Sequence, residues 1–369
     1  MPTYQDRLPQ GRVLSVDALR GFDMFWIIGG SSLVASLMTR AHTPFTLAIA
    51  REFQHSEWHG FTFEDLIFPL FLFIVGVSLS FSLTKRLERG DSRKDMYIQI
   101  VKRTFILYFL GMIINAKLIG SLGGLRYTGV LPRIAFCYFF ASLIVMNFDF
   151  RRQAIWAGAL LIGYWLAMTF IPVPGYGAGV FTPEGSLASW LDRMYLPGQL
   201  RTRLYDNEGI MSTFPAVATT LLGVLSGGWL RRELSPNRKV LGLVGAGAAC
   251  LALGLLWNII FPINKLLWTS SFALFAGGIS ILLLALFYWL IDVRGYRKWS
   301  FPFVVVGLNS ITIYFAQGIF DFGLIVTVFV HEFAGRLGSY RSLFLTVCVI
   351  AMKWLFLYIL YRKKIFLRA

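Results

Sequence analysis

Charged residues are scarce in this chain. Asp, Glu, Lys and Arg make up only 15% of the 369 residues, whereas 56% are hydrophobic and the mean hydropathy is +0.64. A typical soluble domain carries about 25% charged residues. The composition therefore excludes an ordinary soluble domain and predicts a polytopic membrane protein.

Cysteine is rarer still. The three cysteines, Cys137, Cys250 and Cys348, each lie inside an apolar run and show neither pairing nor metal-ligand spacing. We expect them to pack as small hydrophobic side chains, which excludes a disulfide framework. The first sixteen residues contain no apolar segment followed by a small-residue cleavage site, so we expect no removable signal peptide.

Positive charge is the one kind that the chain holds in excess, with a formal net charge of +16. The basic residues stand in short clusters between hydrophobic runs, as is typical of residues that set membrane topology. We therefore expect membrane lipid and no nucleic acid among the partners.

Ten stretches are long and apolar enough to cross a bilayer, which takes about 20 residues each. They are 17–38, 62–84, 97–115, 130–147, 153–171, 212–230, 240–261, 268–291, 301–322 and 342–361. The predicted fold is all-α, a single transmembrane acyltransferase domain over 1–369 with ten helices or at most eleven. The ninth stretch stays open, because apolar residues continue past Asp321 to Val330 and 301–341 can form one span, two, or a re-entrant helix.

The distribution of Lys and Arg over the connections predicts the orientation. If the N-terminus is cytoplasmic, the inner segments carry 20 of these residues and the longer outer segments carry 10. We expect a multi-pass protein of the cell inner membrane with both termini in the cytoplasm.

Several polar residues fall within or near the predicted spans, where a charge costs about 2.5–3.5 kcal/mol at the centre. Their spacing puts Asp17, Arg20 and Asp23 on one helix face, so Arg20 can pair with either carboxylate. We expect Lys353 to reach toward the interface or meet an acid on a neighbouring helix. The others are Asp65, Lys102, Arg103, Arg133, Asp321, Asn115, Asn258, Asn309 and Gln317.

Two of the four histidines, His55 and His59, lie in the loop directly before the second span, which opens with acidic residues. Imidazole and carboxylate groups move protons near neutral pH, so this loop favours catalysis. His42 adds a third imidazole, but Gly60 follows His59 at once and no apolar periodicity predicts a helix there, so we expect no metal site. A surface loop that merely contains histidines is the alternative.

Six short motifs resemble those of one enzyme family, the heparan-alpha-glucosaminide N-acetyltransferases and their bacterial relatives. In chain order they are 12–21 (RVLSVDALRG), 55–62 (HSEWHGFT), 65–69 (DLIFP), 129–133 (GVLPR), 205–209 (YDNEG) and 307–310 (GLNS). The resemblance covers nearly the whole chain. Pro132, Asn207 and Gln317 depart from the Gln, Pro and His of the family pattern.

The resemblance implies transfer of acetyl from cytoplasmic acetyl-CoA to the amine of a terminal glucosamine across the membrane, with His55 as the active histidine. In that chemistry His55 acts as a general base, or as a nucleophile that is transiently acetylated, and Asp65 or Glu57 orients its ring.

Further candidates follow from the chemistry of the two substrates. Cations near inner helix ends suit the phosphates of CoA, and the best placed are Arg103, Arg20 and Lys102. Asn309 and Arg133 are candidates for polarising the thioester carbonyl of the bound donor. The outer-side candidates for the saccharide are Asp206, Glu208, Glu57 and Trp58. Each of these residues has helix capping or packing as its alternative role.

Two other function classes stay open. A permease for a small sugar or anion would use the intramembrane charges as a translocation path, although no internal repeat is detectable. An acyltransferase acting on a lipid-linked or cell-wall saccharide would keep the chemistry and change the acceptor. A homodimer is also left open.

Overall fold

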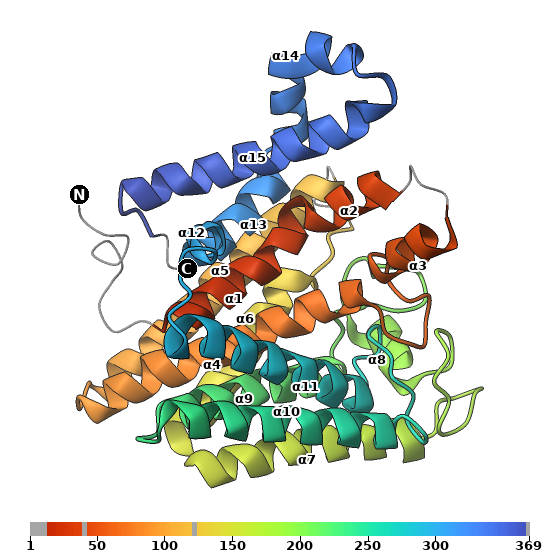
Figure 1. The fold of residues 1–369 in the computed structure, drawn as a ribbon. Helices are drawn as coiled ribbons and strands as arrows, with labels where there is room; N and C mark the ends of the chain where they lie inside the picture. The colour runs from red at the N-terminus through yellow and green to blue at the C-terminus, as the bar shows by residue number, and fades with distance from the viewer. Residues whose placement is uncertain (1–12, 39–42, 120–123, 367–369) are drawn as a thin grey trace. The chain divides into compact units, whose positions relative to one another are not determined.

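The computed structural model describes residues 13–38, 43–119 and 124–366, and this part of the chain is built from helices. The amino-terminal helices are α1 Leu14–Phe25, the π-helix η2 Trp26–Gly30, α2 Ser31–Met38, α3 Pro44–Glu52, α4 Phe63–Glu88, α5 Arg93–Ile119, α6 Val130–Asn147 and α7 Phe150–Phe170. Those that follow are α8 Leu187–Tyr195, α9 Thr213–Leu230, α10 Pro236–Trp257, α11 Ser270–Phe287, the π-helix η3 Tyr288–Val293, α12 Phe301–Leu308, α13 Ser310–Ile319, α14 Phe322–Gly335, the 3-10 helix η4 Gly338–Tyr340 and α15 Arg341–Arg362. Figure 1 shows the helices in chain order.

Within the described residues, nine helices are long and apolar enough to cross a membrane, and a tenth span results if α12 and α13 are counted together. The all-α, multi-pass prediction is confirmed, and the predicted ranges agree closely with these helices. The apolar runs located the spans well because a helix that crosses lipid must satisfy its backbone hydrogen bonds internally over a fixed length.

The uncertain ninth stretch is a broken helix. α12 and α13 meet at Asn309 with a bend of 70°, and the 14-residue helix α14 follows. Asn309 itself has a non-helical ψ of 37°, and its side-chain amide donates to Ile365 O at 3.1 Å. The side chain therefore ties the break to the segment after α15.

The chain divides into two compact units. Unit 1 contains residues up to 55, 62–67 and 283–368, and unit 2 contains 56–61 and 68–282. The single acyltransferase domain remains a prediction.

In unit 1, α1 packs along α12, and two glycines allow their backbones to touch. A Cβ on Gly21 would overlap Phe303 O, and a Cβ on Gly307 would overlap Asp17 O. Small residues at such crossings let membrane helices gain van der Waals contact that lipid cannot compete with. α14 folds back beside α15 in the same unit (Figure 1).

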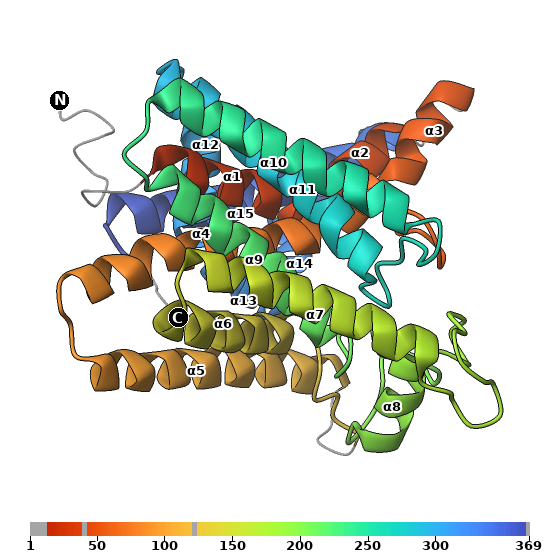
Figure 2. The ribbon, with the colours of Figure 1, turned by 90° about the horizontal axis from the view of Figure 1, so that it is seen from below.

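In unit 2, α5 lies beside α6 and α7 beside α9 (Figure 2). The same device joins α4 to α9, because a Cβ on Gly76 would overlap Thr220 O and a Cβ on Gly223 would overlap Phe73 O. Each unit is thus held by at least one glycine-mediated helix crossing.

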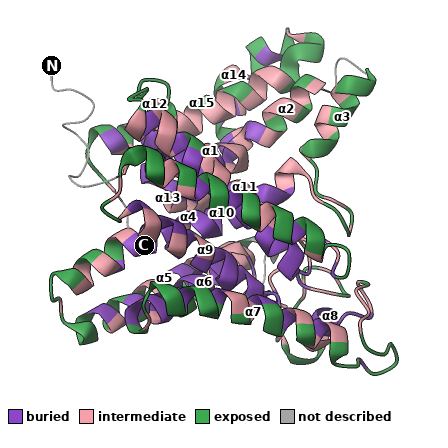
Figure 3. Ribbon diagram, turned by 60° about the horizontal axis from the view of Figure 1, so that its bottom comes forward, coloured by how far each residue is buried: buried purple, intermediate pink, exposed green. Residues whose placement is uncertain are grey.

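The outward faces of the helices are apolar. Figure 3 shows long exposed stretches on α5, α7 and α10, and on α10 these include Leu241, Leu253 and Leu256. Exposed apolar surface on this scale is compatible with lipid and not with water.

Lys353 has two direct hydrogen-bond partners, both neutral. Its ammonium group donates to Ile28 O at 2.8 Å and to Gln317 Oε1 at 3.0 Å, and the acid at the start of α14, Asp321, interacts with it through its charge. Ile28 lies in η2, where Gly29 has a φ of 147° and the regular helical hydrogen bonding is interrupted. The carbonyl released by this irregular turn is an acceptor for the lysine.

The glycine crossing in unit 1 can be tested by adding one methyl group. Gly307→Ala should lower the melting temperature of the purified protein by several degrees, because overpacking costs about 1–3 kcal/mol. Gly158→Ala in α7, where a Cβ has open space, is the matched control and should not lower it. Equal melting temperatures for the two variants would rule out the close approach of α1 and α12.

Candidate active site

His55 and Asp65 form a hydrogen-bonded pair in unit 1. His55 Nδ1 lies 2.9 Å from Asp65 Oδ1, and the carboxylate is fully buried whereas the imidazole side chain is 56% exposed. Asp65 lies in the first turn of α4, where the helix dipole favours a negative charge. The other carboxylate oxygen, Asp65 Oδ2, accepts from Thr62 N and Thr62 Oγ1, both at 3.2 Å.

This arrangement sets the tautomer of His55. A carboxylate oxygen can only accept, so Nδ1 of the neutral ring carries the proton and Nε2 is the proton-accepting nitrogen. Of the two acids considered from sequence, Asp65 holds the ring, and Glu57 is exposed. The loop around His55 is not helical, as expected.

Trp58 is anchored within unit 2. Its indole Nε1 donates to Phe181 O at 2.7 Å, and its ring lies edge-on to Tyr205 with a centroid distance of 5.2 Å. Trp58 also packs against a buried apolar cluster that includes Tyr164, Leu187 and Phe261. The indole is therefore held in one orientation while part of its surface stays accessible.

The next residue, His59, meets Asn264 from the connection between α10 and α11. Asn264 Nδ2 lies 3.4 Å from His59 Nδ1, and burial lowers the pKa of His59. Beside it, Gly60 N donates to Ile263 O at 2.9 Å, with a φ of 120° at Gly60 that L-residues rarely adopt. These two contacts hold His59 and Gly60 against the connection between α10 and α11.

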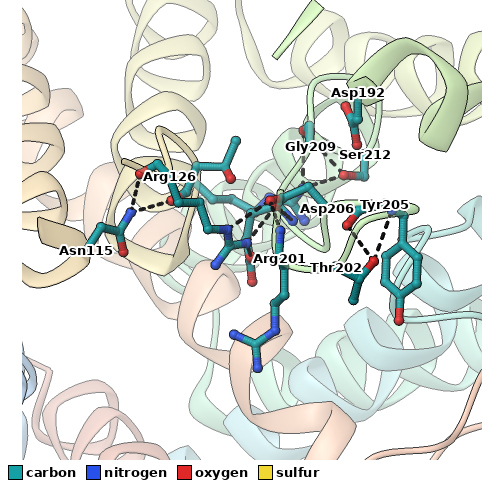
Figure 4. A network of polar contacts seen from close by, with 12 residues as sticks. Asn115, Arg126, Asp192, Arg201, Thr202, Tyr205, Asp206, Gly209 and Ser212 are labelled. Carbon is teal, nitrogen blue, oxygen red and sulfur yellow. Dashed lines mark hydrogen bonds and ion pairs between the residues drawn. The ribbon is translucent and has the colours of Figure 1, made fainter. Parts of the chain in front are cut away.

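Asp206 and Glu208 share one cation, Arg126, that the sequence did not identify as a site residue. Figure 4 shows Arg126 bonded to Asp206. Arg126 binds Asp206 through two nitrogens, Nε at 2.8 Å and Nη2 at 2.6 Å, and Nη2 also binds Glu208. Asn115 in α5 donates to the backbone oxygens of Arg126 and Thr128, both at 2.7 Å, which holds the arginine segment in place. In the sequence, Arg126 was distinguished only as the one arginine of the connection 116–129, which carries few charges.

The ion pair decides the charge state of Asp206. Burial alone would raise its pKa, but hydrogen bonding and charge from Arg126 outweigh burial and the pKa is lowered. Backbone amides of Arg201 and Glu208 donate to the same carboxylate, both at 2.9 Å. Asp206 is therefore a buried, ionised residue that organises the loop.

Asp192 in α8 behaves in the opposite way. Its Oδ1 accepts from Ile210 N at 2.9 Å, yet burial and then the nearby charge of Asp206 raise its pKa to about 7. No space separates Asp192 from Gly209, since a Cβ on that glycine would overlap the Asp192 carboxylate. Gly209 is thus required by the packing of the loop on α8.

Arg133, near the start of α6, is almost fully buried. Its Nη2 donates to Gly209 O at 3.3 Å and to Ser212 Oγ, and its guanidinium lies 5.2 Å from the Trp268 ring centroid. Among the described residues, Nε and Nη1 have no hydrogen-bond partner. Buried donors of this kind call for a ligand or water to satisfy them.

Two predicted residues of unit 1 already have partners. Arg20 Nη1 lies 3.2 Å from Asp17 Oδ1 and 3.4 Å from Gly307 O, so of the two carboxylates considered it pairs with Asp17. Asn309 lies at the break between α12 and α13, as described above.

Arg103 and Lys102 belong to α5 in unit 2. The Arg103 guanidinium lies 4.6 Å from the Tyr138 ring centroid, and in the part of the chain that is described its buried Nε has no partner. Lys102 is exposed. The three cysteines are free, with Cys137 buried.

No group of three or more His, Cys, Asp or Glu side chains that could hold a metal ion occurs in residues 13–38, 43–119 and 124–366. His42, the third imidazole considered from sequence, lies outside the described residues.

Removing the shared cation should destabilise unit 2. Arg126→Ala leaves two acidic side chains without their partner, which typically costs about 3–5 kcal/mol for a buried pair. Chemical denaturation in detergent should show this loss. Arg152→Ala is the matched control, because Arg152 is 69% exposed and lies 4.0 Å from Asp149, and such surface pairs contribute about 0–1 kcal/mol. Similar losses for the two variants would contradict the assigned role of Arg126.

The raised pKa of Asp192 predicts a pH dependence. The unfolded carboxyl titrates near 3.8 and the folded one near 7, so the folded state holds its proton more tightly. The stabilisation from this proton is complete below about pH 4 and is lost as the pH rises toward 7. Between about pH 4 and pH 7, the melting temperature of the parent protein should fall as Asp192 loses its proton. The melting temperature of Asp192→Asn, which cannot ionise at this position, should therefore rise relative to that of the parent over the same interval. A constant difference between the two proteins would show that Asp192 titrates normally.

Comparison with known proteins gives matches that, like the six motifs, extend over most of the chain. A protein-family model described as "Domain of unknown function (DUF5009)" matches residues 12–184. The heparan-alpha-glucosaminide N-acetyltransferase of Homo sapiens is 30% identical over 85% of this chain and 55% of its own length, and that of Mus musculus is 29% identical over 99% and 62%. The chain thus spans less than two thirds of these curated relatives. The resemblance that the motifs predicted is thus confirmed as sequence similarity to these two heparan-alpha-glucosaminide N-acetyltransferases over most of this chain.

Proposed function

We propose that the protein is a transmembrane N-acetyltransferase. It transfers acetyl from cytoplasmic acetyl-CoA to the amine of a glucosamine, or of a glucosamine-terminated saccharide, on the extracytoplasmic side. The observation that carries this proposal is the His55–Asp65 pair at the start of a membrane span. The names of the curated relatives support the same chemistry.

The pair suits aminolysis of a thioester. An amine must lose a proton to attack, and His55 Nε2 accepts it while the buried Asp65 carboxylate stabilises the imidazolium that forms. The new C–N bond replaces the C–S bond of acetyl-CoA, and the proton passes on to the departing thiolate. If His55 attacks the thioester first, Nε2 carries the acetyl group until the amine takes it.

For the donor, we assign Arg103 as the main contact of the CoA phosphates, with Lys102 beside it and Arg20 in a lesser role. The buried Nε of Arg103 has no hydrogen-bond partner within the described ranges, whereas Arg20 is already engaged by Asp17 and Gly307. Guanidinium groups bind phosphate by charge-assisted hydrogen bonds.

The thioester carbonyl needs hydrogen-bond donors, because negative charge develops on its oxygen during attack and the hydrogen bonds to that oxygen then become stronger. Arg133 is the stronger candidate, because two of its buried nitrogens have no partner among the described residues. Asn309 is the second candidate, and its amide currently donates to Ile365 O.

For the acceptor, we assign Trp58, Glu57, Asp206 and Glu208 to the saccharide side. Trp58 offers a fixed aromatic surface, and Glu57 an exposed carboxylate. Asp206 and Glu208 are paired with Arg126, so their contribution is to shape the loop that receives the sugar. The excess of Lys and Arg in alternate connections supports placing the N-terminus and C-terminus in the cytoplasm.

The test of the function is thiol release. Purified protein should liberate CoA thiol from acetyl-CoA over many turnovers when glucosamine is present. Without an acceptor it should release no thiol by the direct route, and one thiol per protein if His55 is acetylated first. A panel of free, lipid-linked and cell-wall amino sugars would identify the saccharide. Sugar flux into vesicles without thiol release would instead identify a permease.

His55→Ala should lower the glucosamine-dependent rate by about 10²–10⁴, which is the usual contribution of a general acid–base group. Acetyl-CoA binding, measured by titration calorimetry, should be retained. His331→Ala, which removes an exposed histidine of α14, is the control and should keep the parent rate. A folded His55→Ala protein with most of the parent activity would exclude His55 as the active histidine.

A further inference from the structure

His59 is held by a side chain that leaves it only one hydrogen-bonding role. Asn264 is fully buried, and its Oδ1 accepts from Leu267 N at 2.8 Å. That bond fixes which end of the amide is oxygen, so Nδ2 is the group that faces His59 Nδ1 at 3.4 Å. An amide NH₂ can only donate, so His59 Nδ1 must accept.

The proton of neutral His59 therefore resides on Nε2. Burial lowers the pKa of His59, which favours the neutral ring near pH 7. The residue as a whole is exposed. The ring thus presents one directed N–H donor.

His55, four positions earlier, is held in the opposite tautomer. Asp65 accepts from its Nδ1, which leaves Nε2 as a base, whereas Asn264 donates to Nδ1 of His59, which makes Nε2 a donor. The two imidazoles of one loop are thus suited to different tasks, and His59 cannot take a proton at the nitrogen that it presents.

The surroundings of His59 suit a sugar. Trp58 and His59 have ring centroids 6.2 Å apart, and Tyr205 lies edge-on to Trp58. The C–H face of a pyranose packs on aromatic rings, and its hydroxyl and ring oxygens accept hydrogen bonds. A site with rigid aromatic surface and few directed polar groups is the usual form of a small-ligand site.

We infer that Trp58, His59 and Tyr205 form a subsite for the acceptor saccharide, in which His59 Nε2–H donates to a hydroxyl or ring oxygen of the sugar. Asn264 is a positioning residue that fixes the tautomer. The inference rests on the proposed function, because that function supplies the reaction in which the sugar is the acceptor. Binding of the sugar to this subsite does not require acetyl-CoA.

The experiment measures equilibrium binding of glucosamine by titration calorimetry, without acetyl-CoA and in the His55→Ala background, so no turnover is needed. His59→Ala should weaken glucosamine binding about tenfold, which corresponds to about 1.4 kcal/mol and lies in the upper part of what one hydrogen bond contributes. His59→Gln, which keeps an N–H donor, should stay within about threefold of the parent. At a pH where the ring is neutral, Asn264→Asp reverses the bond to Nδ1, moves the proton off Nε2, and should weaken binding like His59→Ala.

Retained acetyl-CoA binding establishes that each variant is folded, and Trp58→Ala provides a second route to loss of sugar binding if an Asn264 variant does not fold. Equal affinities for the parent, His59→Ala and His59→Gln would overturn the inference, even if thiol release confirms the acetyltransferase. Sugar binding that depends on His59, in a protein that releases no thiol, would sustain the subsite and reject the proposed function.

Discussion

Lipid provides no hydrogen bonds, and this constraint explains both the regular and the irregular parts of the structure. Most of the described chain satisfies its backbone within helices that match the apolar runs. Where the backbone departs from a helix inside unit 1, side chains bind the exposed carbonyls: Lys353 binds Ile28 O beside the irregular turn at Gly29, and Asn309, at the break between α12 and α13, binds Ile365 O after α15.

The same constraint governs the buried charges. Asp65 is surrounded by donors from His55 and Thr62, and Asp206 by donors from Arg126 and two backbone amides. Arg133 stands apart, because Glu208, Asp206 and Asp192 act on it only through their charge and two of its buried nitrogens have no hydrogen-bond partner among the described residues. A buried cation whose nitrogens lack hydrogen-bond partners indicates a ligand site more strongly than a cation that is already in an ion pair.

The two histidines of one loop show how partners determine chemistry. Residue type and position in the loop are alike for His55 and His59, yet a carboxylate makes the first a base and an amide makes the second a donor. Imidazole is suited to this division because its two nitrogens exchange roles when one of them is engaged. The proposed acetyl transfer uses the base, and the proposed saccharide subsite uses the donor.

The sequence by itself determined the all-α class and the positions of the spans, because a bilayer imposes a length and a polarity that local composition records. Its motifs also predicted the similarity to the N-acetyltransferases. It also identified His55 and Asp65, which lie ten positions apart, as candidates for one site. Only the tertiary structure showed that Arg126 neutralises Asp206 and that Asn264 sets the tautomer of His59, across 80 and 205 positions of chain. Contacts between distant segments depend on how helices pack, and neither the periodicity nor the charge of a single segment encodes that packing.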